Sequence, residues 1–172
     1  MVLVYITGTP GSGKTYLLNS LSSTYDTYDT DDWKDKRSDI KKHVRMIKAK
    51  DTNTHVSVIA GILDHLSPDI EQLFDYKFFM TVSTEQLYKQ INTRLVHIIC
   101  KTKNQIIKLI RKYDDKTLKF SHLQFKPLKQ VKKEYHRDLA TYKRRGYQCL
   151  SAKDIRRLIY KLNGTNNTHT TI

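Results

Sequence analysis

Short apolar runs alternate along this chain with longer segments in which apolar residues recur every three or four positions. The runs are rich in β-branched and aromatic residues, and they predict strands at residues 2–7, 25–28, 55–63, 76–82 and 146–150. The periodic segments predict helices that begin near residues 14, 33, 67, 84, 127 and 151. Because strands alternate with helices, the pattern predicts an α/β fold with a five-stranded, mostly parallel sheet.

Three serines mark predicted helix starts. Ser83 and Ser151 are each followed three residues later by a polar side chain that completes a cap, and Ser67 precedes a proline at the first helical position. The apolar periodicity after Ser83 continues to residue 113, and one straight helix of that length would measure about 45 Å. Since that is too long for a chain of 172 residues, we expect a break near residues 100–104.

The length of 172 residues suits one domain and leaves little room for a second. We expect residues 1–164 to form that domain, with a basic helical insert, or lid, at about 95–146 between the fourth and fifth strands. Residues 165–172 are polar, and we expect them to form a flexible tail.

The cysteine content and the N-terminal residues indicate the cellular compartment in which the protein is expected. The chain holds two cysteines, Cys100 and Cys149, which are too few for a disulfide framework. We therefore expect reduced thiols and a cytoplasmic protein. The apolar start at residues 1–6 is too short for a signal core or a membrane span, so we expect no membrane partner.

A glycine-rich segment follows the first predicted strand and opens the first predicted helix. It fits the pattern G-x-x-x-x-G-K-[ST] without a mismatch and comprises Gly8, Thr9, Pro10, Gly11, Ser12, Gly13, Lys14 and Thr15. Glycines let successive N–H groups point at one anion, and the helix start adds its positive end. We expect these residues to bind ATP, with Lys14 at the terminal phosphates and the Thr15 hydroxyl as a Mg²⁺ ligand.

Two classes of nucleotide-binding protein fit the sequence poorly. A GTPase needs an Asn-Lys-x-Asp stretch that reads guanine and an Asp-x-x-Gly switch, and the chain has neither. A motor ATPase usually ends its third strand in an acid, but here Gly61 stands at that place and Asp64 comes later. The missing guanine motif favours ATP over GTP.

Acidic residues follow the second predicted strand, where the chain reads Tyr-Asp-Thr-Asp-Asp from residue 28 to 32. Asp29 and Asp31 occupy alternate positions, and on an extended chain such side chains point the same way. In a phosphoryl transferase one carboxylate can hold Mg²⁺ while the other orients or deprotonates the attacking hydroxyl. Alternatively, Asp31 or Asp32 caps the next helix. Trp33 beside them either stacks on a base or anchors that helix.

The spacing of the glycine-rich loop, helix, strand and Tyr-Asp-Thr-Asp segment resembles the small P-loop kinases, which include shikimate, gluconate, nucleoside monophosphate and polynucleotide 5′-kinases. The resemblance covers residues 2–32 closely and extends loosely to residue 162. It implies a three-layer P-loop NTPase fold with a lid between the fourth strand and the last. It also implies that Asp29 assists Mg²⁺, that Asp31 binds or deprotonates the acceptor hydroxyl, and that Arg94 contacts the phosphates.

The charge of the chain is strongly asymmetric. The net charge is +14, made up of −2 over residues 1–85 and +16 over residues 86–172. The excess indicates a phosphate-rich ligand or a nucleic acid near the second half, or else a solvated basic surface. Basic residues of the insert are interleaved with aromatic ones, which suits nucleic acid binding. Tyr135 and Tyr142, however, have helical spacing and are expected in the core.

Taken together, these patterns predict an ATP- and Mg²⁺-dependent phosphotransferase whose acceptor is a small molecule, most simply a nucleoside or a nucleotide. Lys14, Asp31, Asp29 and Arg94 are the predicted catalytic residues, and Thr15 and Asp29 the predicted metal ligands. One alternative is a polynucleotide 5′-hydroxyl kinase, because the second half of the chain is basic. The other is a nucleic-acid-binding protein or an NTPase that has a nucleotide pocket and no kinase activity.

Overall fold

The computed structural model describes residues 1–33, 40–50, 56–61, 66–93 and 127–164. The chain divides into two compact units. The first comprises Met1–Val82 and Arg137–Ile172, and the second comprises Ser83–His136. The predicted insert at 95–146 lies largely outside the described residues, as do the predicted break at 100–104 and the predicted tail.

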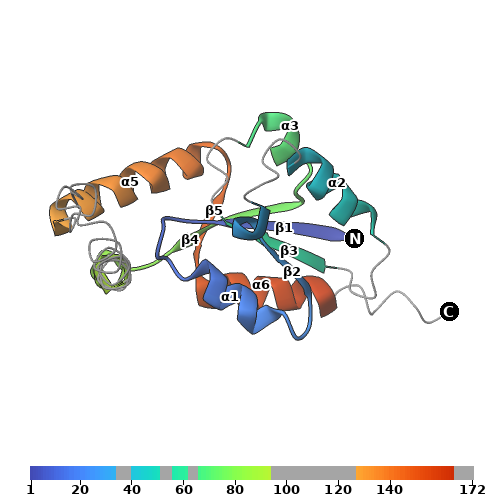
Figure 1. Ribbon diagram of the computed structural model, residues 1–172, viewed down its shortest axis with the longest axis horizontal. Helices are drawn as coiled ribbons and strands as arrows, with labels where there is room; N and C mark the ends of the chain where they lie inside the picture. The colour runs from blue at the N-terminus through green and yellow to red at the C-terminus, as the bar shows by residue number, and fades with distance from the viewer. Residues whose placement is uncertain (34–39, 51–55, 62–65, 94–126, 165–172) are drawn as a thin grey trace, which may run out of the picture. The chain divides into compact units, whose positions relative to one another are not determined.

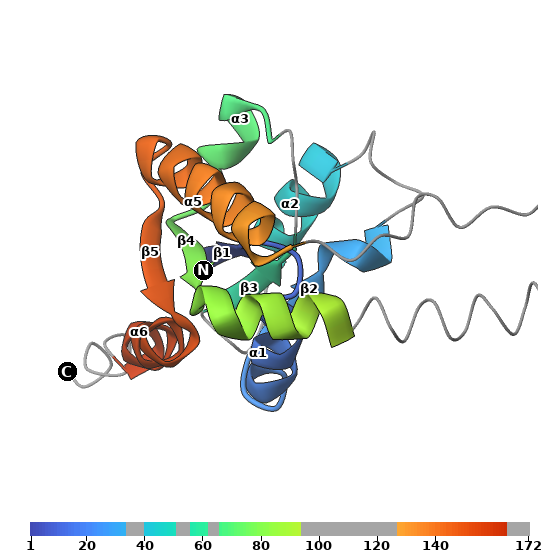
Figure 2. The same ribbon diagram turned by 90° about the vertical axis from the view of Figure 1, so that its left-hand side faces the viewer.

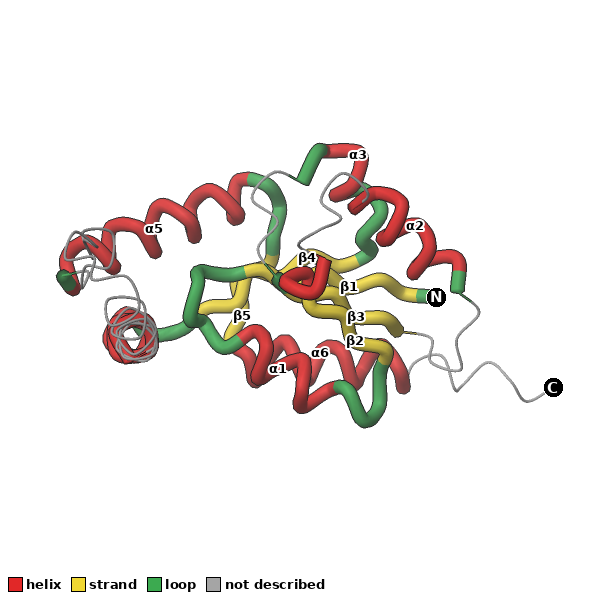
Figure 3. Tube along the Cα trace, in the orientation of Figure 1, coloured by secondary structure: helices red, strands yellow, loops and turns green. Residues whose placement is uncertain are grey.

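The first unit contains one parallel five-stranded sheet (Figures 1 and 3). Its strands are β1 (Val2–Thr7), β2 (Asp26–Asp29), β3 (Val56–Ala60), β4 (Tyr76–Thr81) and β5 (Gln148–Ser151). Their order across the sheet is β2-β3-β1-β4-β5, and all four neighbouring pairs are parallel. The predicted α/β fold and five-stranded sheet are confirmed.

Helices cover both faces of this sheet. The helices that belong wholly to this unit are α1 (Lys14–Leu21), α2 (Ile40–Ala49), α3 (Pro68–Glu71) and α6 (Ala152–Gly164), whereas α5 (Leu128–Arg144) is divided between the two units. In two perpendicular views α1 and α6 lie on one face, and α2 and α3 lie on the other (Figures 1 and 2). No helix within the described ranges is both long enough and apolar enough to cross a lipid bilayer.

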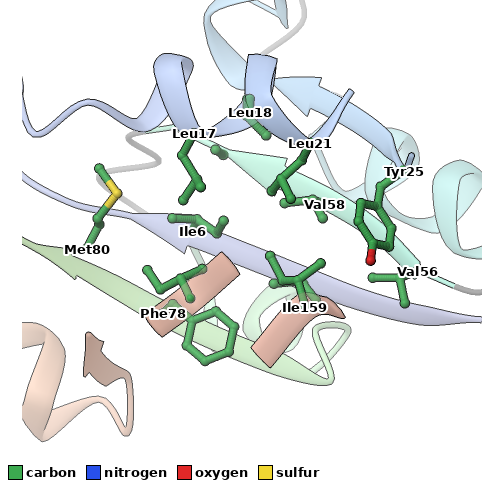
Figure 4. Packing of buried hydrophobic residues seen from close by; sticks show 13 residues of the cluster. Ile6, Leu17, Leu18, Leu21, Tyr25, Val56, Val58, Phe78, Met80 and Ile159 are labelled. Atoms are coloured by element: carbon green, nitrogen blue, oxygen red, sulfur yellow. The ribbon is translucent and has the colours of Figure 1, made fainter. Parts of the chain in front are cut away.

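The main core fills the space between the sheet and the α1–α6 layer (Figure 4). Alternation along β1 points Val4 and Ile6 to this side, and both are fully buried. The helices supply residues at three- and four-residue spacing, so each presents an apolar stripe to the sheet. The buried set from β3, β4, α1 and α6 is Val56, Val58, Ala60, Phe78, Met80, Leu17, Leu18, Leu21, Ile155 and Ile159.

Aromatic side chains pack on the opposite face of the sheet. The Tyr5 ring stacks on Phe74 with centroids 4.9 Å apart, and it meets the edge of Tyr147 at 6.2 Å. Tyr142 lies against Phe79 at 5.1 Å. The prediction that both tyrosines lie in the core holds for Tyr135, which is buried. Tyr142 is only half-buried, with its ring against Phe79 and Tyr147.

A cluster of polar side chains lies on this second face of the sheet near the start of β5. Glu71 accepts a hydrogen bond from the Tyr147 hydroxyl at 2.9 Å and pairs with Arg145. Arg145 also donates to the Leu66 carbonyl at 3.3 Å. Burial, together with the bond to Glu71, raises the pKa of Tyr147 well above its usual value. The cluster ties the end of α3 to the chain that enters β5.

The second unit contains the helical residues 84–93 and the first half of α5. The Gln86 N–H donates to Ser83 Oγ at 3.2 Å, as the capping pattern predicts. Lys132 pairs with Glu85 at 3.2 Å, which links α5 to residues 84–93. Ser151 caps α6 in the same way, because the Asp154 N–H donates to its hydroxyl at 3.2 Å.

The structure corrects one local prediction. The second strand ends at Asp29, and residues 30–33 form a 3₁₀ turn, where the sequence predicts extended chain up to a helix that begins at Trp33. The predicted helix at 33–50 is seen as α2, and residues 34–39 lie outside the described part of the chain.

Candidate functional site

The carboxyl ends of the strands form a topological switch point. β1 lies between β3 and β4 in the middle of the sheet. The chain leaves β1 toward α1 on one face, whereas it leaves β3 toward α3 on the opposite face (Figures 1 and 2). In open parallel sheets ligands bind outside the carboxyl ends of strands at such a point. The glycine-rich loop lies here because it directly follows β1.

The loop needs glycine at three positions, for two different reasons. Gly11 and Gly13 have φ angles of 84° and 95°, which are left-handed conformations that side chains disfavour. A Cβ on Gly8 would lie 2.9 Å from Ser12 Oγ and 3.0 Å from the Met80 carbonyl oxygen. The loop is closed by the Ser12 N–H, which donates to the Thr9 carbonyl at 3.0 Å. These constraints hold the backbone tightly curled ahead of α1.

The Lys14 side chain folds back over this loop. Its ammonium group donates to the Gly8 carbonyl at 2.8 Å, to the Thr9 carbonyl at 3.3 Å and to Ser12 Oγ at 3.5 Å. Lys14 is also the first residue of α1, whose N-terminal N–H groups lack partners within the helix. The positive charge and the helix start therefore converge on one place, as an anion site requires.

Two oxygen donors meet next to the loop. The Thr15 hydroxyl donates to the Asp29 carboxylate at 3.1 Å, which joins the start of α1 to the end of β2. A carboxylate and a hydroxyl are hard donors of the kind that Mg²⁺ prefers, and Mg²⁺ usually takes its remaining ligands from phosphates and water. The pair thus fits the metal that the sequence predicts. Within the described ranges no three His, Cys, Asp or Glu side chains cluster as metal ligands.

Asp31 lies close to Asp29, but not for the reason that the sequence suggests. It belongs to the 3₁₀ turn, so strand alternation does not align the two carboxylates. Instead the Asp31 N–H donates to the Asp29 carboxylate at 3.0 Å. The Asp31 side chain is exposed. Trp33, at the end of the turn, stacks on His43 of α2 with ring centroids 5.5 Å apart, which favours its role as an anchor.

Gly61 and Thr30 are site residues whose role the sequence pattern does not reveal. Gly61 follows β3 and has a φ of 154°; a Cβ there would lie 1.7 Å from Thr30 Oγ1. Its N–H donates to the Ile6 carbonyl of β1 at 3.0 Å. The contact with Thr30 fixes the turn that carries Asp31. The glycine at the place where motor ATPases usually carry an acid is the one sequence signal that points to this contact.

Two buried hydroxyls near the loop lack a hydrogen-bond partner among the described residues. Thr7 Oγ1 lies at the end of β1, and Thr9 Oγ1 lies in the loop itself. Their residues are 1% and 6% exposed. Leaving a buried hydroxyl unsatisfied costs about 1–3 kcal/mol, so such groups call for an explanation. A bound polar ligand at the loop would be one source of partners.

Other predicted residues lie outside the described part of the chain. Arg94 is one of them, so the structure does not test its contact with phosphates. Asp64 is another, as are the aromatic residues of the insert from 95 to 126. The site as described therefore consists of the glycine-rich loop, the start of α1, the acids after β2 and the glycine after β3.

No family model matches this sequence, and no curated protein matches it either. Among solved structures, the chain is similar to one described as "Crystal structure of APE1195". The two are 18% identical, with a TM-score of 0.38 over 59% of this chain and 72% of that one. A structural similarity this weak does not bear on the function of the chain.

Proposed function

We propose that this protein is an ATP- and Mg²⁺-dependent phosphotransferase of the small P-loop kinase type. The observation that carries the proposal is the 3.1 Å contact between the Thr15 hydroxyl and the Asp29 carboxylate beside the glycine-rich loop. The two side chains that the sequence assigns to the metal come from separate elements, the start of α1 and the end of β2, and they are in hydrogen-bond contact. The positive-φ glycines and the folded-back Lys14 support the same assignment.

Each residue then has a positional or an electrostatic role. When bound, Mg²⁺-ATP supplies the transferable phosphoryl group and part of the charge neutralisation. The loop N–H groups and the Lys14 ammonium hold the phosphate oxygens, where developing negative charge needs donors already in place. Thr15 and Asp29 hold the metal. Asp31 is exposed in the 3₁₀ turn that follows Asp29, where it can accept the proton of an acceptor hydroxyl.

The proposed acceptor is a nucleoside or a nucleotide, and a polynucleotide 5′-hydroxyl is the second candidate because of the +16 charge of residues 86–172. The test is a panel of acceptors incubated with γ-labelled ATP and Mg²⁺: nucleosides, nucleoside monophosphates, polyols and 5′-hydroxyl oligonucleotides. We expect label on one acceptor class. Hydrolysis that no acceptor stimulates would contradict the proposal and indicate a plain NTPase.

Replacing Asp29 with asparagine tests the metal site. The change keeps the shape but removes the charge, so we expect the Mg²⁺ concentration for half-maximal activity to rise about tenfold. Titrating Mg²⁺ at saturating ATP measures it. Asp26→Asn, at the far end of the same strand, is the matched control and should leave the titration unchanged. Equal titration curves for wild type and Asp29→Asn would remove Asp29 from the metal site.

Replacing Asp31 with asparagine tests the proposed base. The backbone N–H that donates to Asp29 is retained, so the turn should keep its geometry. Loss of a general base typically lowers the rate about 10²- to 10⁴-fold. Single-turnover transfer from labelled ATP measures it, and Asp32→Asn, the next residue, is the control. If the Asp31→Asn rate equals that of wild type, the base lies elsewhere.

A further inference from the structure

The outer surface of α6 has an unusual composition. From Ala152 to Asn163 its exposed side chains are Lys153, Arg157, Tyr160 and Lys161. Their spacing of four, three and one residues places all four along one side of the helix. This set, called the α6 stripe below, spans about 12 Å at 1.5 Å per residue. Its apolar counterpart, with Ile155 and Ile159, is fully buried against the sheet.

Helices α1 and α6 together contribute one acidic residue to the surroundings of the α6 stripe. The acid on α6 is Asp154, which lies 3.8 Å from Arg157 and accepts a hydrogen bond from the Ser151 hydroxyl at 2.6 Å. Arg157 remains 65% exposed. The neighbouring helix α1 carries no acidic residue. The surface of this layer is therefore positive and open to solvent.

The aromatic ring in the stripe is held in place from one side. Tyr160 packs against Tyr25 with ring centroids 5.8 Å apart, and it is still 45% exposed. Tyr25 is buried directly before β2, so it fixes the Tyr160 ring while leaving part of it open. An aromatic ring that is ordered beforehand loses little entropy when a planar group stacks on it.

A second exposed aromatic lies on α1. Tyr16 is 78% exposed and directly follows Thr15 of the glycine-rich loop. Arg156 of α6 donates to Ser20 Oγ of α1 at 2.8 Å, so the two helices lie side by side. Both helices start at the carboxyl edge of the sheet, since each follows a parallel strand. A path along the α6 stripe therefore leads toward Tyr16 and the loop.

We propose that the α1–α6 surface binds single-stranded nucleic acid, with Lys153, Arg157 and Lys161 on the backbone phosphates and Tyr160 and Tyr16 stacking on bases. Cationic residues interleaved with exposed aromatic rings are what non-specific single-strand binding requires. An anionic membrane would be the other polyanionic surface, but membrane-bound helices insert Trp, Phe or Leu. The large exposed apolar side chains of the described residues are Met1, Tyr16, Met46 and Tyr160.

The proposal goes beyond phosphotransfer, so the test is run without nucleotide or Mg²⁺. Fluorescence anisotropy of labelled 20-nucleotide oligo-dT and oligo-U, titrated with the full chain between 50 and 200 mM KCl, gives affinity and salt dependence. For single strands each lost phosphate contact lowers the slope of log K against log salt by about 0.7. Arg157→Gln/Lys161→Gln should therefore lower the slope by about 1.4 and weaken binding at 100 mM salt about tenfold.

A matched pair on α2 controls for overall charge. Lys42→Gln/Arg45→Gln removes the same two charges from exposed positions of another helix and should leave slope and affinity unchanged. Tyr160→Leu should weaken binding about fivefold or more with no change in slope, because stacking carries no charge. Circular dichroism melting verifies that each variant is folded.

Three outcomes would overturn the proposal. One is an equal loss in the α2 pair, which would make the binding a matter of net charge alone. Another is a Tyr160→Leu variant that binds like wild type. The third is binding to vesicles rich in phosphatidylserine that depends on Arg157 and Lys161 while the oligonucleotides do not bind. Failure of the acceptor panel described above affects none of these measurements.

Discussion

Lys14→Ala is expected to lower phosphoryl transfer from labelled ATP about 100- to 1,000-fold, the usual cost of removing one preorganised donor that stabilises transition-state charge. The Lys14 ammonium is held 2.8 Å from the Gly8 carbonyl, above the curled loop. No other described side chain in the loop is charged, so the loop N–H groups would bind the phosphates alone. Initial rates over the acceptor panel measure the loss.

The controls for this variant separate chemistry from folding. Lys42→Ala removes an exposed lysine of α2 and should retain full transfer. Lys14→Met keeps the aliphatic length without the charge and should be as inactive as Lys14→Ala. Both Lys14 variants should melt within a few degrees of wild type, because the ammonium bonds to the loop are only partly buried. Transfer above one tenth of the wild-type rate would exclude Lys14 as the phosphate-binding lysine.

Gly61→Ala is expected to destabilise the protein by about 3 kcal/mol or more, since overpacking and a disfavoured φ each cost about 1–3 kcal/mol. The new Cβ would overlap Thr30 Oγ1 at 1.7 Å and meet Thr30 Cβ at 2.7 Å. For a chain of this length the loss corresponds to roughly 6–12 °C in Tm. Thermal or urea unfolding followed by circular dichroism measures it. The 3₁₀ turn must also shift, so activity should fall along with stability.

Gly146→Ala is the matched control for this effect. Gly146 also has a positive φ, 79°, but a Cβ there would meet nothing within 4 Å. It therefore isolates the backbone strain, about 1–2 kcal/mol. Adding Thr30→Ala to Gly61→Ala removes the two outermost clashing atoms and should recover part of the difference. A Gly61→Ala loss no larger than that of Gly146→Ala would show that the Thr30 contact is not rigid.

The periodicity of the sequence was sufficient to predict most of the fold. The apolar runs predict all five strands to within three residues at each end, the first of them with no deviation, and the serine caps at Ser83 and Ser151 are confirmed. These features are local, because a strand's alternation or a helix cap depends on neighbouring residues. The glycine-rich loop was local in the same sense, since eight consecutive residues define it.

The rest of the site depends on non-local geometry. The order β2-β3-β1 decides that Asp29 comes within 3.1 Å of Thr15, and no pattern along the chain encodes that order. The turn at Thr30 was missed because Asp and Thr residues suit an extended chain and a turn alike. What selects the turn is packing against Gly61, thirty-one positions later in the chain.

The order in which the core residues are synthesised determines when the core can form. The glycine-rich loop and α1 are synthesised well before Ile155 and Ile159, the residues of α6 that complete the core against α1. At roughly 5–20 residues per second, the 141 residues that follow Lys14 up to and including Ile155 take about 7–28 s to synthesise. During that interval the apolar side of α1 has no α6 to pack against. Ribosome-stalled chains that end before Ile155 should therefore lack a stable candidate site at the glycine-rich loop.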